Sequence, residues 1–288
     1  MTRVGTIRQV RRYPVKSMGG EVLDEVEVGV GGIPGDRAWA VRDEVRGGIR
    51  GAKKIAKLME LEARYLSAPE AKGSSPAQIT LQDGTTVETG SAEVNERLSK
   101  AVGQPISLWP LIDAEQLDHY RRGAPAHEDM ERELREIFGR APDEPLPDLG
   151  LFPPELMEFE SPPGTYFDAF PLLLMSDAAL ASMAHKAPDS VFDVRRFRPN
   201  FVISDTEPGV DFPEFAWEKS RLKVGEAILS LEIACPRCVM TTHGFADLPK
   251  DPGVMRALVR DAGGNLGLYA SVEQAGRVHS GDPVELLG

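Results

Sequence analysis

Cysteine is scarce in this chain, with two copies among 288 residues. Both lie in one C-x-x-C segment, Cys235 to Cys238. Two cysteines are too few for a disulfide framework, for a four-cysteine zinc site, or for an iron–sulfur cluster that needs about four thiolates. The two thiols therefore have a chemical or an incidental use, and any electrons must come from another molecule.

Positive charge and long apolar runs are also scarce. The formal net charge is -12, which argues against a general nucleic-acid binder, because counterion release needs a basic surface. No run approaches the roughly 18 apolar residues of a membrane helix, and residues 1–10 lack the apolar stretch of a secretory signal. We expect a cytoplasmic protein with neither nucleic acid nor a membrane as partner, in which local basic clusters are informative.

The hydrophobic content of 41% is enough to bury a core, and the length favours two folding units. Period-two alternation predicts strands at several places, and Asp83-Gly84 suits a tight hairpin turn. The predicted strands cover residues 4–15, 21–30, 38–41, 78–81, 85–89, 201–204, 227–234, 269–272 and 283–287, and residues 170–175 form an apolar run. These patterns predict a β-dominated α+β fold.

Helices are expected where caps precede helical spacing. Ser91 is the expected cap of a helix over residues 94–102, and Ser176-Asp177 of one over residues 178–186. Further helices are predicted over residues 127–138 and 253–261. Between residues 141 and 163, seven prolines leave little room for regular structure, so this stretch is the best linker or covering loop.

The Cys235-Pro236-Arg237-Cys238 segment is compatible with several hypotheses about its role. A zinc site needs a second ligand pair, and the nearest candidates, His243 and Asp247, lack standard spacing. Dithiol redox chemistry needs the motif at a helix start, whereas residues 239–242 are β-prone. Both cysteines could also be small core residues. Arg237 counts against that last reading, because a guanidinium is rarely buried without an anion and stabilises a thiolate beside it.

Three basic or hydroxyl-bearing stretches surround predicted strand ends. Arg195 to Asn200 holds three arginines in four positions, which is typical of a solvated face or an anion site, and Pro199 predicts an extended backbone that aims Arg198 and Asn200 the same way. The other two are Tyr13 to Ser17 and Gly35 to Arg37. Each stretch alone is typical of a surface turn. Together they predict cationic loops at strand ends, in a protein whose overall net charge repels anions.

These stretches resemble the MOSC superfamily, named for the C-terminal domain of molybdenum-cofactor sulfurase, and within it the proteins with an N-terminal MOSC β-barrel region, such as the amidoxime-reducing components. The resemblance rests on motifs spread over nearly the whole chain: Tyr13-Pro14-Val15-Lys16-Ser17, Gly35-Asp36-Arg37, Arg196-Phe197-Arg198-Pro199-Asn200, Cys235-Pro236-Arg237-Cys238-Val239-Met240-Thr241-Thr242, Gly267-Leu268-Tyr269-Ala270 and Gly281-Asp282-Pro283-Val284. The Arg-Phe-Arg-Pro-Asn and Arg-Cys-x-x-Thr-Thr elements are specific in combination.

The resemblance implies a fold and a site. It implies a MOSC barrel with flanking helices over residues 166–288, an N-terminal β-rich unit over residues 1–110, and a helix and Pro-rich connection over residues 111–165. Residues 1–40 are expected to pack into the C-terminal barrel. Cys238 would ligate the molybdenum of a molybdopterin cofactor, and Cys235 would support it without ligating. The positions expected to hold the pterin and its phosphate are Lys16, Ser17, Arg37, Arg198, Asn200, Arg237 and Cys238.

The implied activity is two-electron reduction of N-hydroxylated compounds, such as amidoximes and hydroxylamino-purines. A separate electron donor of the flavin reductase or ferredoxin type is expected. After Thr241-Thr242 the chain departs from the amidoxime-reducing proteins, so His243 and Asp247 are only candidates for the catalytic proton donor. The alternative function is a sulfur or cofactor carrier that forms a persulfide on Cys238 or Cys235.

Overall fold

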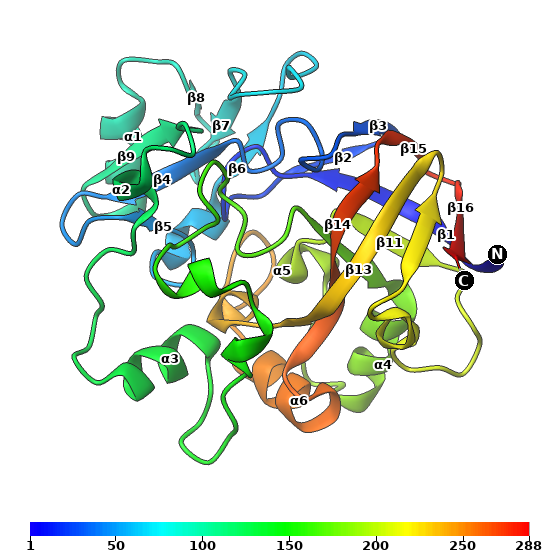
Figure 1. Ribbon diagram of the computed structural model, residues 1–288. Helices are drawn as coiled ribbons and strands as arrows, with labels where there is room; N and C mark the ends of the chain where they lie inside the picture. Colours follow the sequence, from blue (N-terminus) through cyan, green and yellow to red (C-terminus); the bar gives the residue numbers. More distant parts are fainter. Residues whose placement is uncertain (288) are drawn as a thin grey trace.

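The computed structural model describes residues 1–287, and its centre is a closed β-barrel (Figure 1). Seven strands follow one another around the ring in the order β1, β11, β10, β14, β13, β12 and β16, and β16 pairs with β1 to close it. Their bounds are β1 Thr2–Arg12, β10 Leu172–Ser176, β11 Phe201–Ser204, β12 Arg221–Val224, β13 Ala227–Pro236, β14 Asn265–Gln274 and β16 Pro283–Leu287. The predicted β-dominated barrel fold is confirmed.

The barrel encloses its own hydrophobic core. Burial alternates strictly along β13, so that Leu229, Leu231 and Ile233 point inward, as period-two geometry requires. β1 contributes Ile7 and Val10 to the same core, and it is the barrel strand that comes from the N-terminal part of the chain. In Figure 1 the blue β1 lies beside the red β16, and both termini are found there.

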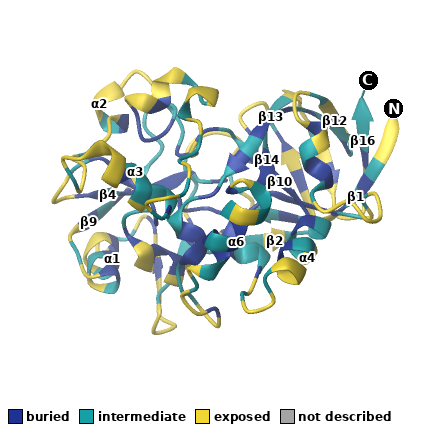
Figure 2. Ribbon diagram, turned by 90° about the horizontal axis from the view of Figure 1, so that it is seen from below, coloured by how far each residue is buried: buried dark blue, intermediate teal, exposed yellow. Residues whose placement is uncertain are grey.

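Three smaller sheets accompany the barrel. One pairs β5 (Ile49–Arg50), β4 (Trp39–Asp43) and β9 (Ile106–Pro110), and another pairs β6 (Glu62–Arg64), β7 (Gln78–Thr80) and β8 (Thr86–Glu88). These two surround a second core that includes Leu58, Leu61 and Leu98. The third sheet pairs β3 (Glu25–Val28) with β15 (Gly276–His279), and β2 (Glu21–Leu23) adds to β1. Figure 2 shows buried residues in both the barrel and the N-terminal part.

Helices connect and cover the sheets. Their bounds are α1 Val94–Val102, α2 Leu117–Tyr120, α3 Met130–Phe138, α4 Asp177–Lys186, α5 Val194–Phe197 and α6 Gly253–Ala262, with short 3-10 turns η1 Ala56–Glu60, η2 Leu149–Leu151, η3 Pro154–Met157, η4 Pro213–Trp217 and η5 Val239–Thr242. No helix within residues 1–287 has both the length and the apolar character needed to span a membrane. The proline-rich stretch contains only short turns, as predicted.

Some local predictions are confirmed and others are wrong. The side chain of Ser176 caps α4 by accepting from Ala179 N, whereas Ser91 does not cap α1, because the cap position is taken by Glu93. Arg198 does not continue an extended run. It ends α5 in a left-handed conformation with φ 58. The stretch after Cys238, expected to be β-prone, forms the 3-10 turn η5.

A buried carboxyl group, that of Glu214, makes the stability of the fold depend on pH. Glu214 is fully buried, and its carboxylate accepts hydrogen bonds from the Ser176 backbone N–H, at 3.2 Å, and from the Ser176 hydroxyl, at 2.5 Å. Burial raises its pKa. A carboxyl group whose pKa is raised by folding stabilises the protein fully below its unfolded pKa, and that contribution is lost as pH rises through the folded pKa.

We therefore predict that the Glu214→Gln variant loses less stability than the wild type when pH rises from about 4.5 to 8, since an amide does not titrate. The melting temperature of both proteins, followed across that range, measures the difference. The remaining titratable groups are common to the two proteins and cancel in the comparison. If the melting temperatures of the two proteins change with pH in the same way, Glu214 is not the group that causes the loss of stability.

Candidate functional site

Cys238 lies where the chain leaves the barrel. Strand β13 ends at Pro236, and Cys238 then occupies the cap position directly before η5, with extended backbone. The Met240 N–H donates to the Cys238 thiol, while the hydroxyl of Thr241 donates to the Cys238 carbonyl at 3.0 Å. The thiol side chain is half-buried. The turn thus fixes the backbone and leaves the Cys238 side chain partly exposed.

The three basic stretches meet beside this turn. Tyr13 N–H donates to the carboxylate of Asp36 at 2.7 Å, and the Asn200 amide donates to the other oxygen of Asp36 at 3.0 Å. The guanidinium of Arg198 lies 4.1 Å from the centre of the Tyr13 ring, and that of Arg37 lies 5.1 Å from it. One carboxylate and one aromatic ring therefore hold together segments that are distant in the sequence.

Backbone strain is concentrated at the same place. Ser17, Arg37 and Arg198 adopt positive φ angles of 70, 51 and 58. L-residues with side chains rarely adopt this conformation, and it persists only where the surroundings enforce it. The cost is offset locally because the Ser17 hydroxyl accepts from Ala52 N at 2.9 Å and the Arg198 guanidinium donates to the Met18 carbonyl. Such strain is typical of a site whose side chains must point in set directions.

A cleft of about 450 Å3 opens over these residues. All the positions predicted to hold a cofactor line it, together with further cations that sequence reasoning did not select. The cationic lining residues are Lys16, Arg37, Arg50, Lys53, Lys54, Arg122, Arg196, Arg198 and Arg237, and the anionic ones are Glu133, Glu160 and Asp168. In a chain of net charge -12, this local excess of positive charge attracts an anionic ligand.

Among residues 1–287, three guanidinium nitrogens in the cleft lining are buried without a hydrogen-bond partner. They are Nε of Arg50, Nη2 of Arg198 and Nε of Arg237. An unpaired buried donor costs roughly 1–3 kcal/mol, and more when it is charged. Burial, and secondly the charge of Arg37, lowers the pKa of Arg198 to about 10. Within the described part of the chain, the protein supplies no acceptor for these three donors, and the residues that carry them line the cleft.

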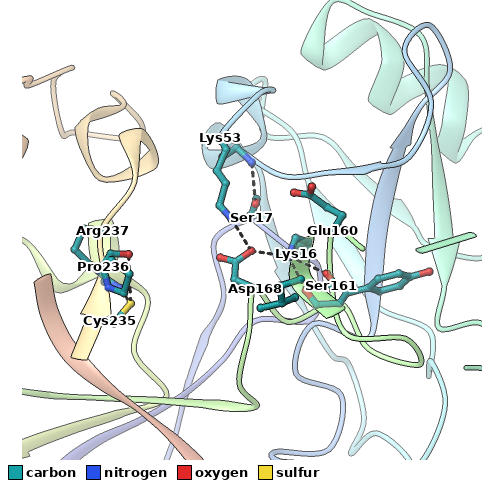
Figure 3. Close-up of polar contacts among 12 residues, drawn as sticks. Lys16, Ser17, Lys53, Glu160, Ser161, Asp168, Cys235, Pro236 and Arg237 are labelled. Atoms are coloured by element: carbon teal, nitrogen blue, oxygen red, sulfur yellow. Dashed lines mark hydrogen bonds and ion pairs between the residues drawn. The ribbon is translucent and has the colours of Figure 1, made fainter. Parts of the chain in front are cut away.

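Lysines and carboxylates form the opposite side of the cleft. Figure 3 shows Lys16, Lys53, Asp168 and Glu160 grouped together, apart from Arg237 and Cys235. Lys16 Nζ donates to Asp168 Oδ1 at 2.7 Å and to the Tyr166 carbonyl at 2.8 Å, and Lys53 Nζ lies 3.3 Å from the same Asp168 oxygen. Although burial alone would raise it, the charges of Lys16 and Lys53 hold the pKa of Asp168 well below its usual value.

The two cysteines have different surroundings. Burial raises the pKa of the Cys238 thiol, and the charge of Lys53 offsets part of that effect. Cys235 is almost fully buried and accepts a hydrogen bond from Arg237 Nη1 at 2.8 Å. Tyr269 also makes a side-chain hydrogen bond with Cys235. Cys238 is therefore the more accessible of the two sulfurs, while Cys235 positions Arg237.

Some predicted residues are engaged in contacts with other parts of the protein. His243 Nε2 lies 2.9 Å from the Ala52 carbonyl, and burial lowers the pKa of the ring. Asp247 is exposed and forms an ion pair with Arg195 at 2.7 Å. Neither lines the cleft that contains Cys238. Asn200 does line it, but its amide is already bonded to Asp36 and Leu173.

Sequence reasoning missed several residues of the cleft. Lys53 and Lys54 form a visible basic pair in an irregular stretch, which is the signal that could have selected them. Asp168 carried no such signal, since it is one of 45 acidic residues. Within residues 1–287, no group of three or more His, Cys, Asp or Glu side chains is arranged to hold a metal ion.

Comparison with protein families agrees with this architecture. Residues 4–109 match the MOSC N-terminal beta barrel domain, and residues 163–285 match the MOSC domain. The chain therefore belongs to the MOSC-domain proteins that carry an N-terminal MOSC barrel region, as the motifs had indicated. Residues 110–162, between the two matches, belong to neither domain.

Known relatives are named as amidoxime-reducing proteins. The chain is 27% identical to mitochondrial amidoxime reducing component 2 of Rattus norvegicus, covering 99% of this chain and 84% of that protein. It is 26% identical to mitochondrial amidoxime-reducing component 1 of Homo sapiens, covering 100% and 85% respectively. Among solved structures, the YUAD protein from Bacillus subtilis is 14% identical with a TM-score of 0.44, covering 98% of this chain and 95% of that one.

Proposed function

We propose that this chain is a molybdenum-cofactor-binding oxidoreductase that reduces N-hydroxylated compounds with electrons from a separate redox partner. The observation that carries the proposal is the cleft beside Cys238, in which three buried guanidinium groups have nitrogens without partners. The names of the relatives support the reaction class. A cytoplasmic location stays a prediction, and those relatives are named as mitochondrial proteins.

The residues present fit such a cofactor. Arginine donors suit a phosphate, because a guanidinium offers several N–H groups in one plane. Arg50, Arg198 and Arg237 would hold this anionic end, and Lys16 and Lys53 would add positive potential. A half-buried thiol with an N–H donor beside it suits a soft transition metal. Cys238 would therefore supply the protein ligand.

When bound, the cofactor supplies the two-electron chemistry that cleaves an N–O bond and releases water. The protein itself would bind and orient the cofactor and the substrate, and it would shape the electrostatic potential of the cleft. Asp168 fixes the ammonium groups of Lys16 and Lys53 on one side of the cleft, at 2.7 and 3.3 Å. Arg237 is fixed on the other side by the Phe197 carbonyl and by Cys235. These contacts keep the cations in place before any ligand arrives.

Metal and pterin analysis of protein from a cofactor-competent host tests the proposal. We expect stoichiometric molybdenum and molybdopterin, together with reduction of an amidoxime or a hydroxylamino-purine by an artificial electron donor. A metal-free protein whose mass reveals a cysteine persulfide would instead support the sulfur-carrier alternative. Protein with neither molybdenum nor persulfide would contradict both.

The separate electron donor is tested by reconstitution. Loaded protein is mixed with a flavin reductase or a ferredoxin, and reduction of the bound cofactor is followed spectroscopically. We expect no turnover with reduced nicotinamide alone and turnover once a partner protein is present. Turnover in the absence of any partner protein would contradict this part of the proposal.

Lys53→Met is predicted to weaken cofactor retention about tenfold, because a hydrogen bond to a charged group contributes about 1.5–3 kcal/mol. The side chain of Lys53 bonds to Asp168 and is one-quarter exposed, so its loss should leave the fold intact. Molybdopterin remaining after extended dialysis measures the effect. Lys72→Met, which removes the same charge from an exposed position outside the cleft, is the matched control and should retain cofactor like the wild type.

A further inference from the structure

One wall of the cleft comes from the segment that neither family domain covers. Residues 110–162 lie between the two matched domains. The segment contains α2, α3 and the proline-rich stretch, and in Figure 1 the green α3 lies apart from the barrel. Its side chains in the cleft are mostly apolar, and they include Leu134, Ile137, Phe138, Phe152, Leu156 and Met157.

Helix α3 presents an apolar face to the cleft. Met130, Leu134, Ile137 and Phe138 follow a spacing of four, three and one residues, which places them on one side of a helix. All four line the cleft. Within residues 1–287, none of them belongs to a hydrophobic core cluster, and Met130 is 59% exposed. The face therefore lines the cleft without being part of a hydrophobic core cluster among these residues.

The wall is held firmly against the site. Glu133 is 4% exposed, bonds to Lys54 Nζ at 2.5 Å, and accepts from Ala126 N at 3.0 Å and His127 N at 3.2 Å. α3 ends at Phe138, and the following Gly139 packs so close to Val239 that an added Cβ would lie 3.3 Å from the Val239 Cα. Val239 follows Cys238 directly. The C-terminal end of α3 is thus fixed near Cys238, which lines the same cleft.

The two sides of the cleft differ in chemistry. The barrel and the N-terminal part of the chain carry most of the arginines and lysines that suit an anion, whereas the α3 side offers mainly apolar contact. Apolar surface of this kind gains about 25 cal/mol for each square ångström removed from water. A substrate that fills the space beside Cys238 would place its apolar body against α3 and its polar reacting group toward the cationic side.

We propose that residues 110–162 form a specificity wall, and that the favoured substrates are N-hydroxylated compounds with an aromatic or alkyl body rather than small polar ones. This inference rests on the proposed function. The positions that set the preference are Leu134 and Ile137 of α3, which are half-buried and line the cleft.

The test compares two amidoximes that differ only in their apolar body, benzamidoxime with a phenyl group and acetamidoxime with a methyl group. In the loaded wild type, kcat/KM for the phenyl compound is expected to exceed that for the methyl compound by about tenfold or more. In Leu134→Ser/Ile137→Ser the ratio is expected to fall about tenfold, because kcat/KM for the phenyl compound falls more than kcat/KM for the methyl compound. Leu151→Ser, at an exposed apolar position of the same segment outside the cleft, is the control and keeps the wild-type ratio.

A calorimetric binding measurement without any electron donor separates the two proposals. Benzamidoxime is expected to bind the wild type and to bind the double variant at least about fivefold more weakly. If the wild type binds it but reduces no amidoxime, the proposed reaction fails while the wall is supported. If the kcat/KM ratio and the affinity for benzamidoxime are the same in the wild type and the double variant, the specificity wall is refuted, while the proposed reaction is unaffected. If the double variant does not fold, Ile137→Thr is the second variant, because it changes the wall less. It is expected to lower the ratio of the two kcat/KM values by a smaller factor.

Discussion

The Cys238→Ala variant, produced in a cofactor-competent host, is expected to contain almost no molybdenum. Removing an outer-shell partner already costs about 10–100-fold in metal affinity, so removal of the only protein ligand that we assign should cost at least as much. The thiol is half-buried at the start of η5, and an alanine there leaves the turn's backbone hydrogen bonds in place. Elemental analysis of purified protein, normalised to protein concentration, measures the loss.

Cys235→Ser is the matched control for that experiment. Its sulfur is buried and accepts from Arg237 at 2.8 Å, and a hydroxyl oxygen accepts equally well. The variant is expected to keep at least about half of the wild-type molybdenum, since the metal ligand itself is untouched. Full metal content in Cys238→Ala, or loss only in Cys235→Ser, would move the ligand assignment to the other cysteine or remove it.

Arg196→Met is expected to lower the free energy of unfolding by about 3–5 kcal/mol. The side chain is 1% exposed, and its guanidinium donates to four backbone carbonyls, those of Val191 at 3.0 Å, Thr241 at 3.2 Å, His243 at 2.8 Å and Pro249 at 2.7 Å. Methionine fills part of the volume but leaves these acceptors without donors. Because two of them lie in or next to η5, the turn that carries Cys238 should loosen as well.

The neighbouring Arg195→Met is the control for this prediction. Arg195 is partly exposed and pairs with Asp193 at 2.8 Å and Asp247 at 2.7 Å. Exposed ion pairs contribute about 0–1 kcal/mol, so this variant should unfold with nearly wild-type stability. Urea denaturation curves of the three proteins give the comparison. Equal losses in both variants would mean that the charge of the arginine cluster matters, rather than the carbonyl contacts of Arg196.

Much of the fold could be predicted because short-range patterns determine strands and turns. The alternation along residues 227–234 predicts β13, and β11 and β16 have the predicted bounds. The missed strands, β5, β6, β9, β10, β12 and β15, are two to five residues long. Such segments contain too few alternating positions for a periodicity to appear, and their pairing with distant strands decides them.

Three nearly consecutive arginines make different contacts, and this shows why the site was harder to predict than the fold. Arg195 forms surface ion pairs, Arg196 binds backbone carbonyls in the interior, and Arg198 stacks on Tyr13 beside the cleft. The sequence identifies all three as equal candidates for an anion site. Their directions differ because α5 is followed by a left-handed residue, and that turn is enforced by tertiary contacts.

The sequence by itself determined the β-dominated class, the family motifs and the cysteine segment, because these depend on local alternation and on residue identity. Only the tertiary structure decided that Asp168 and Lys53 belong to the cleft, that His243 and Asp247 lie outside it, and that residues 110–162 supply an apolar wall. The physical reason is that burial, and the partner that satisfies each buried charge, depend on segments brought together from more than a hundred residues away.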